Sequence, residues 1–444
     1  MPENRSRGGD GGRDRAVDAL RAFAILGVVL GHWLVTALVV DSPGRRLHVA
    51  SPLKAMPELA PLTWVLQTLA VFFLVGGYSA AKSLRPGEPW SRRMRRRLAR
   101  FARPLPALAI VWVAAAAALP RAGLPESSVR ALIELVLSPL WFLCVYVVLT
   151  AFTPLIAAAW TRFGLAGAAL LVAATAGIDL GRFALGAPGW TGWATVLTAW
   201  LLPFYLGVGW ANGALRSRGA GLALLGGGTA ATALLVLSAG YPASMVGVPG
   251  AAVSNLSPPT LAAVAFGLAQ TGLATLLHGP LTRWTRHARA RSAVAAANRS
   301  AMAIYLWHQT ALLTVTMGAL FAFGSLKGLH TVPDQPEWIA ERLAWLVASG
   351  GALAAGGALA AAFPRPRRHA RDTIAGNQPA PRPVLLQRRL LIHRGVSPTH
   401  AERSSMVERR RCRRTSRRPR RAPRDGTPAA SAGPPPPPRP SGWC

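Results

Sequence analysis

The chain has 444 residues, 51% of them hydrophobic, and a formal net charge of +33. Most apolar residues fall in blocks of about 20, the length of a helix that crosses a bilayer, which excludes a large soluble domain. The predicted fold class is therefore an all-α polytopic membrane protein. Its cysteines, Cys144, Cys412 and Cys444, have neither a disulfide framework nor a metal-ligand spacing, so no metal site is expected.

The positive charge is unevenly distributed along the chain. Much of it lies in an Arg- and Pro-rich tail, and most of the rest lies in short segments between apolar blocks, where it sets topology. We expect a disordered N-terminus at 1–12, a transmembrane domain at 13–363 and a disordered cytoplasmic tail without a core at 364–444. The richness in Ala, Gly and Arg suggests a bacterial source.

The first predicted span, Arg13 to Val40, contains ionisable residues at regular positions and no cleavable signal peptide. Arg21 and His32 are about three turns apart at ~3.6 residues per turn, so they share one stripe of the helix, about 16 Å from each other. Asp18, one turn before Arg21, can orient its guanidinium. Such residues inside a span are functional candidates. The spacing alone also fits a membrane anchor and a structural histidine.

The second predicted span, Leu62 to about Ser83, contains VFFLVGGYSAAKSL, whose glycine pair permits close helix approach. The densest charge run before the tail follows, SRRMRRRLARFARPLPAL, and leads into a third span from Phe101 to Leu119. Anchoring by the positive-inside rule accounts for part of this run. The remaining arginines are suited to phosphate, which accepts bidentate, charge-assisted hydrogen bonds.

The later spans follow the same pattern of apolar blocks and basic loops. A fourth span carries SPLWFLCVYVVLTAFTPL, and a ninth reads NRSAMAIYLWHQTALLTVTMG. Arginine recurs in the loops 84–100, 160–164, 211–219 and 278–299, which predicts about ten transmembrane helices with both termini cytoplasmic. The other expected spans are Leu165–Ile178, Thr195–Trp210, Gly221–Ala239, Thr260–Leu277 and Trp338–Phe363.

The string VDALRAFAILGVVLGH resembles the first-helix signature of the integral-membrane acyltransferase 3 family. VFFLVGGYSAAKSL, PLWFL and YLWH resemble three weaker family segments, with Gly76 where serine is usual. The resemblance implies a multi-pass protein of the plasma (inner) membrane that moves acyl groups, often acetyl, from acyl-coenzyme A onto sugar or other hydroxyls across the membrane, with the cell envelope as the expected setting. In that family the histidine is regarded as catalytic and the arginine as essential, here His32 and Arg21.

The resemblance also gives an expected set of site residues. His32 would act as general base, with Arg21 and loop arginines positioning the donor. No permanently bound cofactor is expected; acyl-coenzyme A, with acetyl-coenzyme A as the simplest case, is the donor. The expected partners are membrane lipid and a carbohydrate or lipid-linked acceptor. The arginines expected at acyl-coenzyme A are Arg93, Arg96, Arg97 and Arg100, and the candidate substrate contacts are Tyr78, Trp141, Tyr305 and His308.

Three alternatives stay open at this point. A multispan transporter or flippase without acyl-transfer chemistry would also have ten spans, buried histidines and basic loops, although no duplication between the halves is evident. The basic tail could bind anionic lipid or RNA, although no nucleic-acid partner is expected. Trp141 and His308 could be an interfacial anchor and a structural hydrogen-bonding group. An acyl-histidine intermediate and the identity of the acceptor are also undecided.

Overall fold

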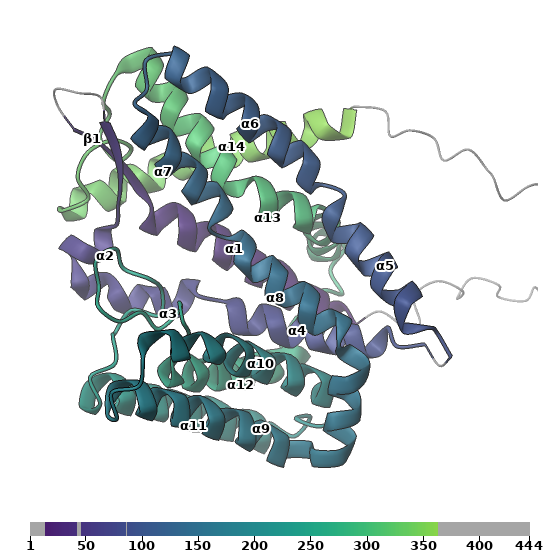
Figure 1. Ribbon diagram of the computed structural model, residues 1–444. Coiled ribbons are helices and arrows are strands. Elements are labelled where there is room, and N and C mark those ends of the chain that lie inside the picture. Colours follow the sequence, from purple (N-terminus) through teal and green to yellow (C-terminus); the bar gives the residue numbers. More distant parts are fainter. Residues whose placement is uncertain (1–13, 42–45, 86, 363–444) are drawn as a thin grey trace, which may run out of the picture. The chain divides into compact units, whose positions relative to one another are not determined.

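A computed structural model describes residues 14–41, 46–85 and 87–362, except for the side chains of Arg100 and 359–362. The expected N-terminal segment and tail lie outside the described residues. Helices make up most of the described part (Figure 1). In order, the elements are α1 (Arg15–Val35), β1 (Ala37–Asp41), β2 (Arg46–Ala50), α2 (Pro52–Ala55), the 3-10 helix η1 (Pro57–Leu62), α3 (Thr63–Leu66), α4 (Leu69–Lys82), α5 (Trp90–Ala102), α6 (Leu105–Arg121), α7 (Glu126–Leu137), α8 (Leu140–Ala151), α9 (Thr153–Phe183), the 3-10 helix η2 (Gly189–Ala194), α10 (Thr195–Ala211), α11 (Arg218–Ser238), α12 (Leu261–Trp284), α13 (Ala288–Phe323) and α14 (Pro336–Ala362).

Eight segments of the described chain are long and apolar enough to cross a membrane. They are α1, η1 through α4, α7 with α8, α9, η2 with α10, α11, α12 and α13. Helix α6 is apolar but has only 17 residues, and α14 covers the described part of the expected tenth span, up to Ala362. The protein is therefore a mostly helical, multi-span membrane protein. The count of ten spans and the cytoplasmic location of both termini stay predictions.

Helix α1 carries the first predicted site residues and contacts several other helices. It packs against α3, α4, α12, α13 and α14. Its N-terminus is capped by Asp14, whose carboxylate accepts hydrogen bonds from the Ala16 and Val17 N–H groups at 3.1 and 3.2 Å. An acidic cap satisfies free amide groups and complements the helix dipole. The cap thereby fixes where α1 begins and, with it, the position of Arg21 along the helix.

The first span is shorter than the sequence predicted. Helix α1 ends at Val35 rather than near Val40, and the chain continues as an antiparallel hairpin of β1 and β2, with Ala37 opposite Ala50. The β-branched, apolar segment ALVVD suits a strand as well as a membrane helix, so apolar length alone placed the boundary wrongly. Within the described residues, this two-stranded sheet departs from the all-α prediction.

A buried arginine marks the point where α1 ends. Arg342 on α14 is 1% exposed, and its guanidinium donates hydrogen bonds to the carbonyl oxygens of Trp33 (2.8 Å), Thr36 (2.5 Å) and Gly328 (3.2 Å). A cation at this position satisfies carbonyls that have no helical partner and complements the negative end of the helix dipole. Arg342 therefore ties the turn of α1 that carries His32 to α14.

The second span is broken rather than continuous. Gln67 and Thr68 separate α3 from α4, and Gln67 is extended. A break inside a membrane leaves backbone groups that need partners. Gln270 on α12 donates a hydrogen bond to the Gln67 carbonyl, and the Thr68 hydroxyl donates to the Ala24 carbonyl of α1 at 2.7 Å. The break therefore packs against the middle of α1.

Four segments predicted as loops are largely helical. The segment 84–100 contains most of α5, 120–139 contains α7, and 278–299 is reduced to a short turn between α12 and α13. The segment 160–164 lies within α9, whose helical geometry is interrupted at Gly164 (φ 50°). The length of an apolar run does not show where these helices begin and end, because charged residues such as arginine extend a helix as readily as apolar ones.

Glycines bring α4 and α10 into very close contact. A Cβ atom added to Gly77 would lie 2.0 Å from the carbonyl oxygen of Phe204, and one added to Gly207 would lie 2.0 Å from that of Leu74. Small residues at an interface let membrane helices approach each other in this way. Gly76 instead packs against an aromatic ring of α8. The close approach predicted from the glycine pair is confirmed.

Candidate active site

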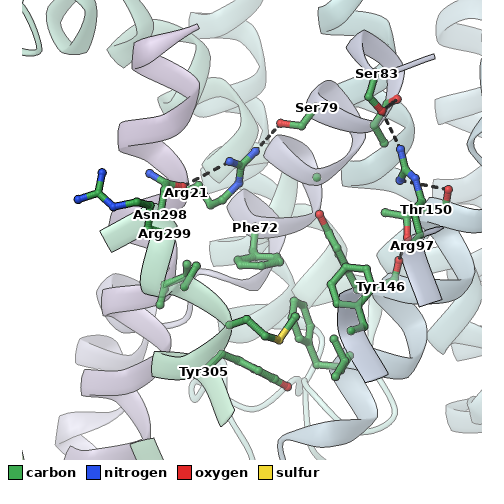
Figure 2. A pocket seen from close by; sticks show the side chains of 18 of the residues that line it. Arg21, Phe72, Ser79, Ser83, Arg97, Tyr146, Thr150, Asn298, Arg299 and Tyr305 are labelled. Atoms are coloured by element: carbon green, nitrogen blue, oxygen red, sulfur yellow. Dashed lines mark hydrogen bonds between the residues drawn. The ribbon is translucent and has the colours of Figure 1, made fainter. Parts of the chain in front are cut away.

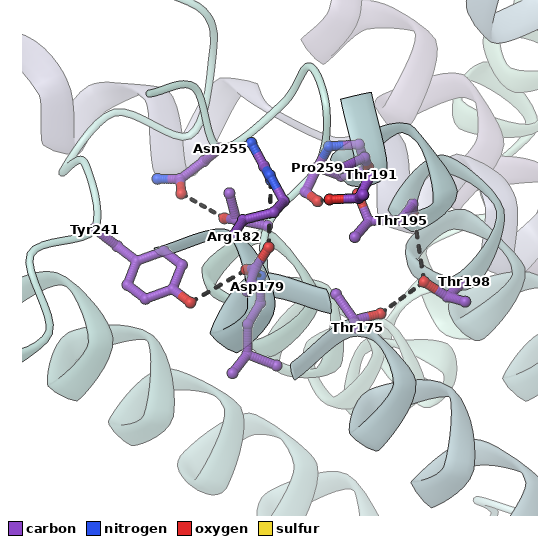
Figure 3. Close-up of polar contacts among 12 residues, drawn as sticks. Thr175, Asp179, Arg182, Thr191, Thr195, Thr198, Tyr241, Asn255 and Pro259 are labelled. Carbon is purple, nitrogen blue, oxygen red and sulfur yellow. Dashed lines mark hydrogen bonds and ion pairs between the residues drawn. The ribbon is translucent and has the colours of Figure 1, made fainter. Parts of the chain in front are cut away.

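Arg21 lies where three helices meet. Its guanidinium contacts Asp18 of α1 at 3.2 Å. It also contacts Asn298 of α13 at 3.3 Å and the Ser79 hydroxyl of α4 (Figure 2). Asn298 also donates from Nδ2 to the Asp18 carbonyl at 2.8 Å. The spacing of Asp18 and Arg21 therefore gives the ion pair that the sequence predicted. With its side chain 24% exposed, Arg21 is a positioned cation that a ligand can reach.

A cavity of about 500 Å³ opens beside Arg21, and α1, α4, α5, α8 and α13 line it. This volume is typical of small-molecule sites. Its lining includes four arginines, Arg21, Arg96, Arg97 and Arg299. Helices that are far apart in the sequence thus form one cavity, and part of its wall is strongly positive.

The arginine run predicted to bind acyl-coenzyme A divides between different places. Arg96 and Arg97 line the cavity. Arg97 donates a hydrogen bond to the Ser83 hydroxyl at 2.7 Å (Figure 2), and the Arg96 side chain is 42% exposed. Arg93 lies in a separate groove, and the side chain of Arg100 is outside those described. The structure therefore brings two of the four predicted arginines to Arg21.

The rest of the cavity wall is mainly apolar and aromatic. Phe72 of α4 contacts Phe142 and Tyr146 of α8, with ring centroids 5.0 and 5.2 Å apart. Phe142 in turn contacts Tyr305 of α13 at 5.6 Å, and Met302 also lines the cavity. Figure 2 shows Phe72, Tyr146 and Tyr305 in this wall. Such a wall can hold an aliphatic chain next to the arginines. Tyr305, a predicted substrate contact, is part of it.

His32 and His308 lie side by side near this aromatic wall, with ring centroids 5.0 Å apart. The His308 ring is 6.2 Å from that of Tyr305, which lines the cavity. His32 Nδ1 is 2.9 Å from the Val28 carbonyl and His308 Nδ1 is 2.7 Å from the Tyr305 carbonyl. Because a carbonyl only accepts, each neutral ring is assigned its proton on Nδ1 and a lone pair on Nε2.

The buried Nε2 atom of His308 has no hydrogen-bond partner among the described residues. In that part of the chain no third His, Cys, Asp or Glu joins the two histidines as a metal site. The arrangement therefore offers proton-accepting nitrogens inside the membrane protein. Neither histidine lines the cavity itself; His308 is linked to it through the ring of Tyr305. Acid–base chemistry needs this kind of oriented lone pair.

A family model described as an acyltransferase domain, that of the acyltransferase 3 family, matches residues 14–362. The chain belongs to this family. The match covers most of the chain, so the resemblance first noted in α1 is confirmed, and the protein is a membrane acyltransferase that uses an acyl donor and an acceptor. Neither the curated proteins nor the solved structures compared with the chain give a match.

Two substrate contacts predicted for this acyltransferase lie away from the cavity. The Tyr78 hydroxyl donates to the Asp14 carboxylate at 2.9 Å, and its ring packs on Trp210 at 5.0 Å. Trp141 packs on Trp200 at 6.0 Å. Both side chains have clear packing partners, and neither lines the cavity. Their roles as substrate contacts stay predictions.

Several residues around Arg21 in this acyltransferase were not predicted from the sequence. Ser79, Asn298 and Arg299 line the cavity, and the first two bond the Arg21 guanidinium. Each is a polar residue near the end of an apolar run, at the level where Arg21 was expected. A search for polar residues at that depth in every span would have found them, because such residues rarely lie in a membrane without a partner.

Proposed function

We propose that this acyltransferase moves an acyl group, acetyl in the simplest case, from cytoplasmic acyl-coenzyme A to a hydroxyl of a sugar, glycan or lipid-linked acceptor. The observation that carries the proposal is the cavity beside Arg21, which joins an arginine-lined side to an aromatic side near two histidines. Acyl-coenzyme A has the same division, with phosphates at one end and an aliphatic arm with a thioester at the other.

The arginines suit the phosphate end of the donor. Guanidinium groups bind phosphate oxygens through bidentate, charge-assisted hydrogen bonds. Arg97 is held by Ser83 at 2.7 Å and by the Thr150 carbonyl at 3.4 Å, so part of its ordering cost is met before a ligand binds. Arg21 is held in the same way by Asp18. Together they support a role in fixing the donor so that its arm runs along the aromatic wall.

His32 is the proposed general base. As the acceptor oxygen attacks the thioester carbonyl, Nε2 of His32 takes the hydroxyl proton; the C–S bond then breaks, and the departing thiolate recovers that proton. The hydrogen bond from Nδ1 to the Val28 carbonyl keeps the ring in the tautomer that this step needs. Binding donor and acceptor together supplies the proximity. An acyl group carried on Nε2 would use the same lone pair.

Radiolabelled acetyl-coenzyme A supplied to membranes that contain the full chain tests this function. We expect label to enter an envelope glycan or lipid-linked sugar, with the acylated product identified by mass spectrometry against membranes that lack the protein. Absence of any acylated product, together with substrate movement that does not need acyl-coenzyme A, would instead support a transporter.

A further inference from the structure

A second hollow lies at the start of α5, separate from the cavity beside Arg21. It is a groove of about 740 Å³, formed by the turn after α4, the first turns of α5 and the junction of α8 with α9. The two hollows share no lining residue. The proposed donor site therefore leaves this groove without a role.

Arg93 lines the groove and is buried without being fully hydrogen-bonded. The residue is 3% exposed, and its Nη2 atom pairs with Glu88 at 3.3 Å. Its Nε and Nη1 atoms have no acceptor among the described residues. Glu88 also pairs with Arg96 at 3.1 Å, so one carboxylate is shared by two guanidinium groups. Buried donors without an acceptor are costly, and a phosphate group would supply acceptors.

The surroundings of Arg93 are apolar and exposed. Trp90, Phe152 and Leu155 are 52%, 45% and 66% exposed. Three candidate spans end at this groove, those formed by η1 through α4, α7 with α8, and α9. The groove therefore lies at the level of a membrane surface, where tryptophan is enriched and lipid phosphates are found. Arg85, which is exposed, adds a second cation to the lining.

We propose that this groove binds an anionic membrane phospholipid. The phosphate accepts hydrogen bonds from Arg93 and Arg85, and an acyl chain lies on Phe152 and Leu155. Basic pockets between membrane helices bind anionic headgroups in this way. A phospholipid fits better than acyl-coenzyme A, because lipid tails cover the exposed apolar side chains beside the groove. Arg93, predicted from the sequence as a donor contact, is thus assigned to lipid.

Native mass spectrometry of the full chain in mild detergent tests the site. Phosphatidylglycerol is titrated against wild type, Arg93→Gln and Arg85→Gln, with phosphatidylcholine, inorganic phosphate and coenzyme A as competitors. We expect phosphatidylglycerol to bind wild type and each variant to lose about tenfold in affinity or more, as for a lost hydrogen bond to a charged group. None of the three competitors should displace the lipid at equal concentration.

The matched control is Arg95→Gln, because Arg95 lies on the same helix, is exposed and lines neither hollow. It should bind phosphatidylglycerol like wild type. Arg85→Gln changes an exposed residue and so keeps the test valid if Arg93→Gln fails to insert. The proposal would be overturned if all three variants lost affinity equally or if the two groove variants lost none. It would also be overturned if inorganic phosphate displaced the lipid, or if Arg93→Gln bound coenzyme A more weakly than wild type.

Discussion

His32 is the residue whose individual chemistry can be tested most directly. If His32 is the general base, it acts only in the proton transfer, so His32→Ala should impair that step alone. We predict that acyl transfer falls by ~10²–10⁴-fold while acyl-coenzyme A binding stays near wild type. The control is His48→Ala, because His48 is exposed on β2 and pairs with Asp41. A transfer rate near that of wild type in a correctly inserted His32→Ala chain would contradict the assignment.

The cavity arginines give a second prediction for single residues. Reversing the charge of Arg96 and Arg97 to glutamate should weaken acyl-coenzyme A binding, because both line the cavity and repel the donor phosphates once reversed. Added salt should weaken donor binding to wild type in the same direction. Equilibrium binding of labelled acyl-coenzyme A measures both. Arg95→Glu makes one such charge reversal outside the cavity. An effect there as large, per reversed charge, as that of Arg96 and Arg97 would show that these arginines act on membrane topology and not on the donor.

Residue spacing predicted some contacts of the site and not others. Asp18 and Arg21 form an ion pair because one helical turn brings them together wherever the helix packs. The division of the arginine run could not be foreseen in this way. Arg93 turns to Glu88 in the preceding turn, whereas Arg97 meets Ser83 and α8. Those partners are set by how the chain folds back, which the local pattern does not contain.

At the scale of helices, the contact with α10 holds α4, one of the helices that line the cavity. Gly77→Ala would place a methyl group 2.0 Å from the backbone oxygen of Phe204, where no side chain can move aside. We predict a loss of about 1–3 kcal/mol in stability, as for overpacking, and a lower yield of inserted protein. Gly177→Ala in α9 is the control, since its Cβ would meet no atom within 4 Å. Thermal unfolding in detergent should separate the two variants.

The start of α1 gives a pH-dependent prediction. Burial raises the pKa of Asp14, but hydrogen bonds from His278, the Val17 N–H and Tyr78 outweigh this effect and lower the pKa from 3.8 to about 2. The charged carboxylate thus stabilises the fold fully above pH 4, and this stability is lost as pH falls towards 2.

Asp14→Asn retains a good N-cap but loses the charge. Its melting temperature should lie below that of wild type at pH 6, and the difference should shrink at pH 3. Asp41→Asn, which changes an exposed carboxylate of the hairpin, serves as the control. A difference for Asp14→Asn that does not depend on pH would show that shape, not charge, matters at this cap.

The ends of elements were harder to predict than their existence. Every expected span corresponds to at least one helix, because long apolar blocks favour helices in a membrane. The end of α1 depends on Arg342, which donates to the Trp33 and Thr36 carbonyls from the far end of the domain. The break at Gln67 likewise depends on Gln270. Helix ends that depend on partners far away in the sequence cannot be predicted from the local sequence.

At the scale of the whole molecule, the site belongs to helices drawn from nearly the entire family domain. Arg21 comes from α1, Ser79 from α4 and Asn298 from α13, so no contiguous part of the chain holds the site. Helix α14 contributes through Arg342, which fixes the end of α1 beyond His32. A chain cut before Pro336 would lose this anchor.

The segment after the family match gives the last prediction. A chain ending near Arg368 keeps every described element and the whole match to residues 14–362. The sequence beyond it is rich in Arg and Pro and lacks the apolar periodicity of a core. We therefore predict normal insertion and a wild-type rate of transfer from labelled acetyl-coenzyme A per inserted molecule. A chain ending before Pro336 is the inactive control, since it lacks Arg342. A well-inserted Arg368 truncation without transfer would show that the tail takes part in the reaction.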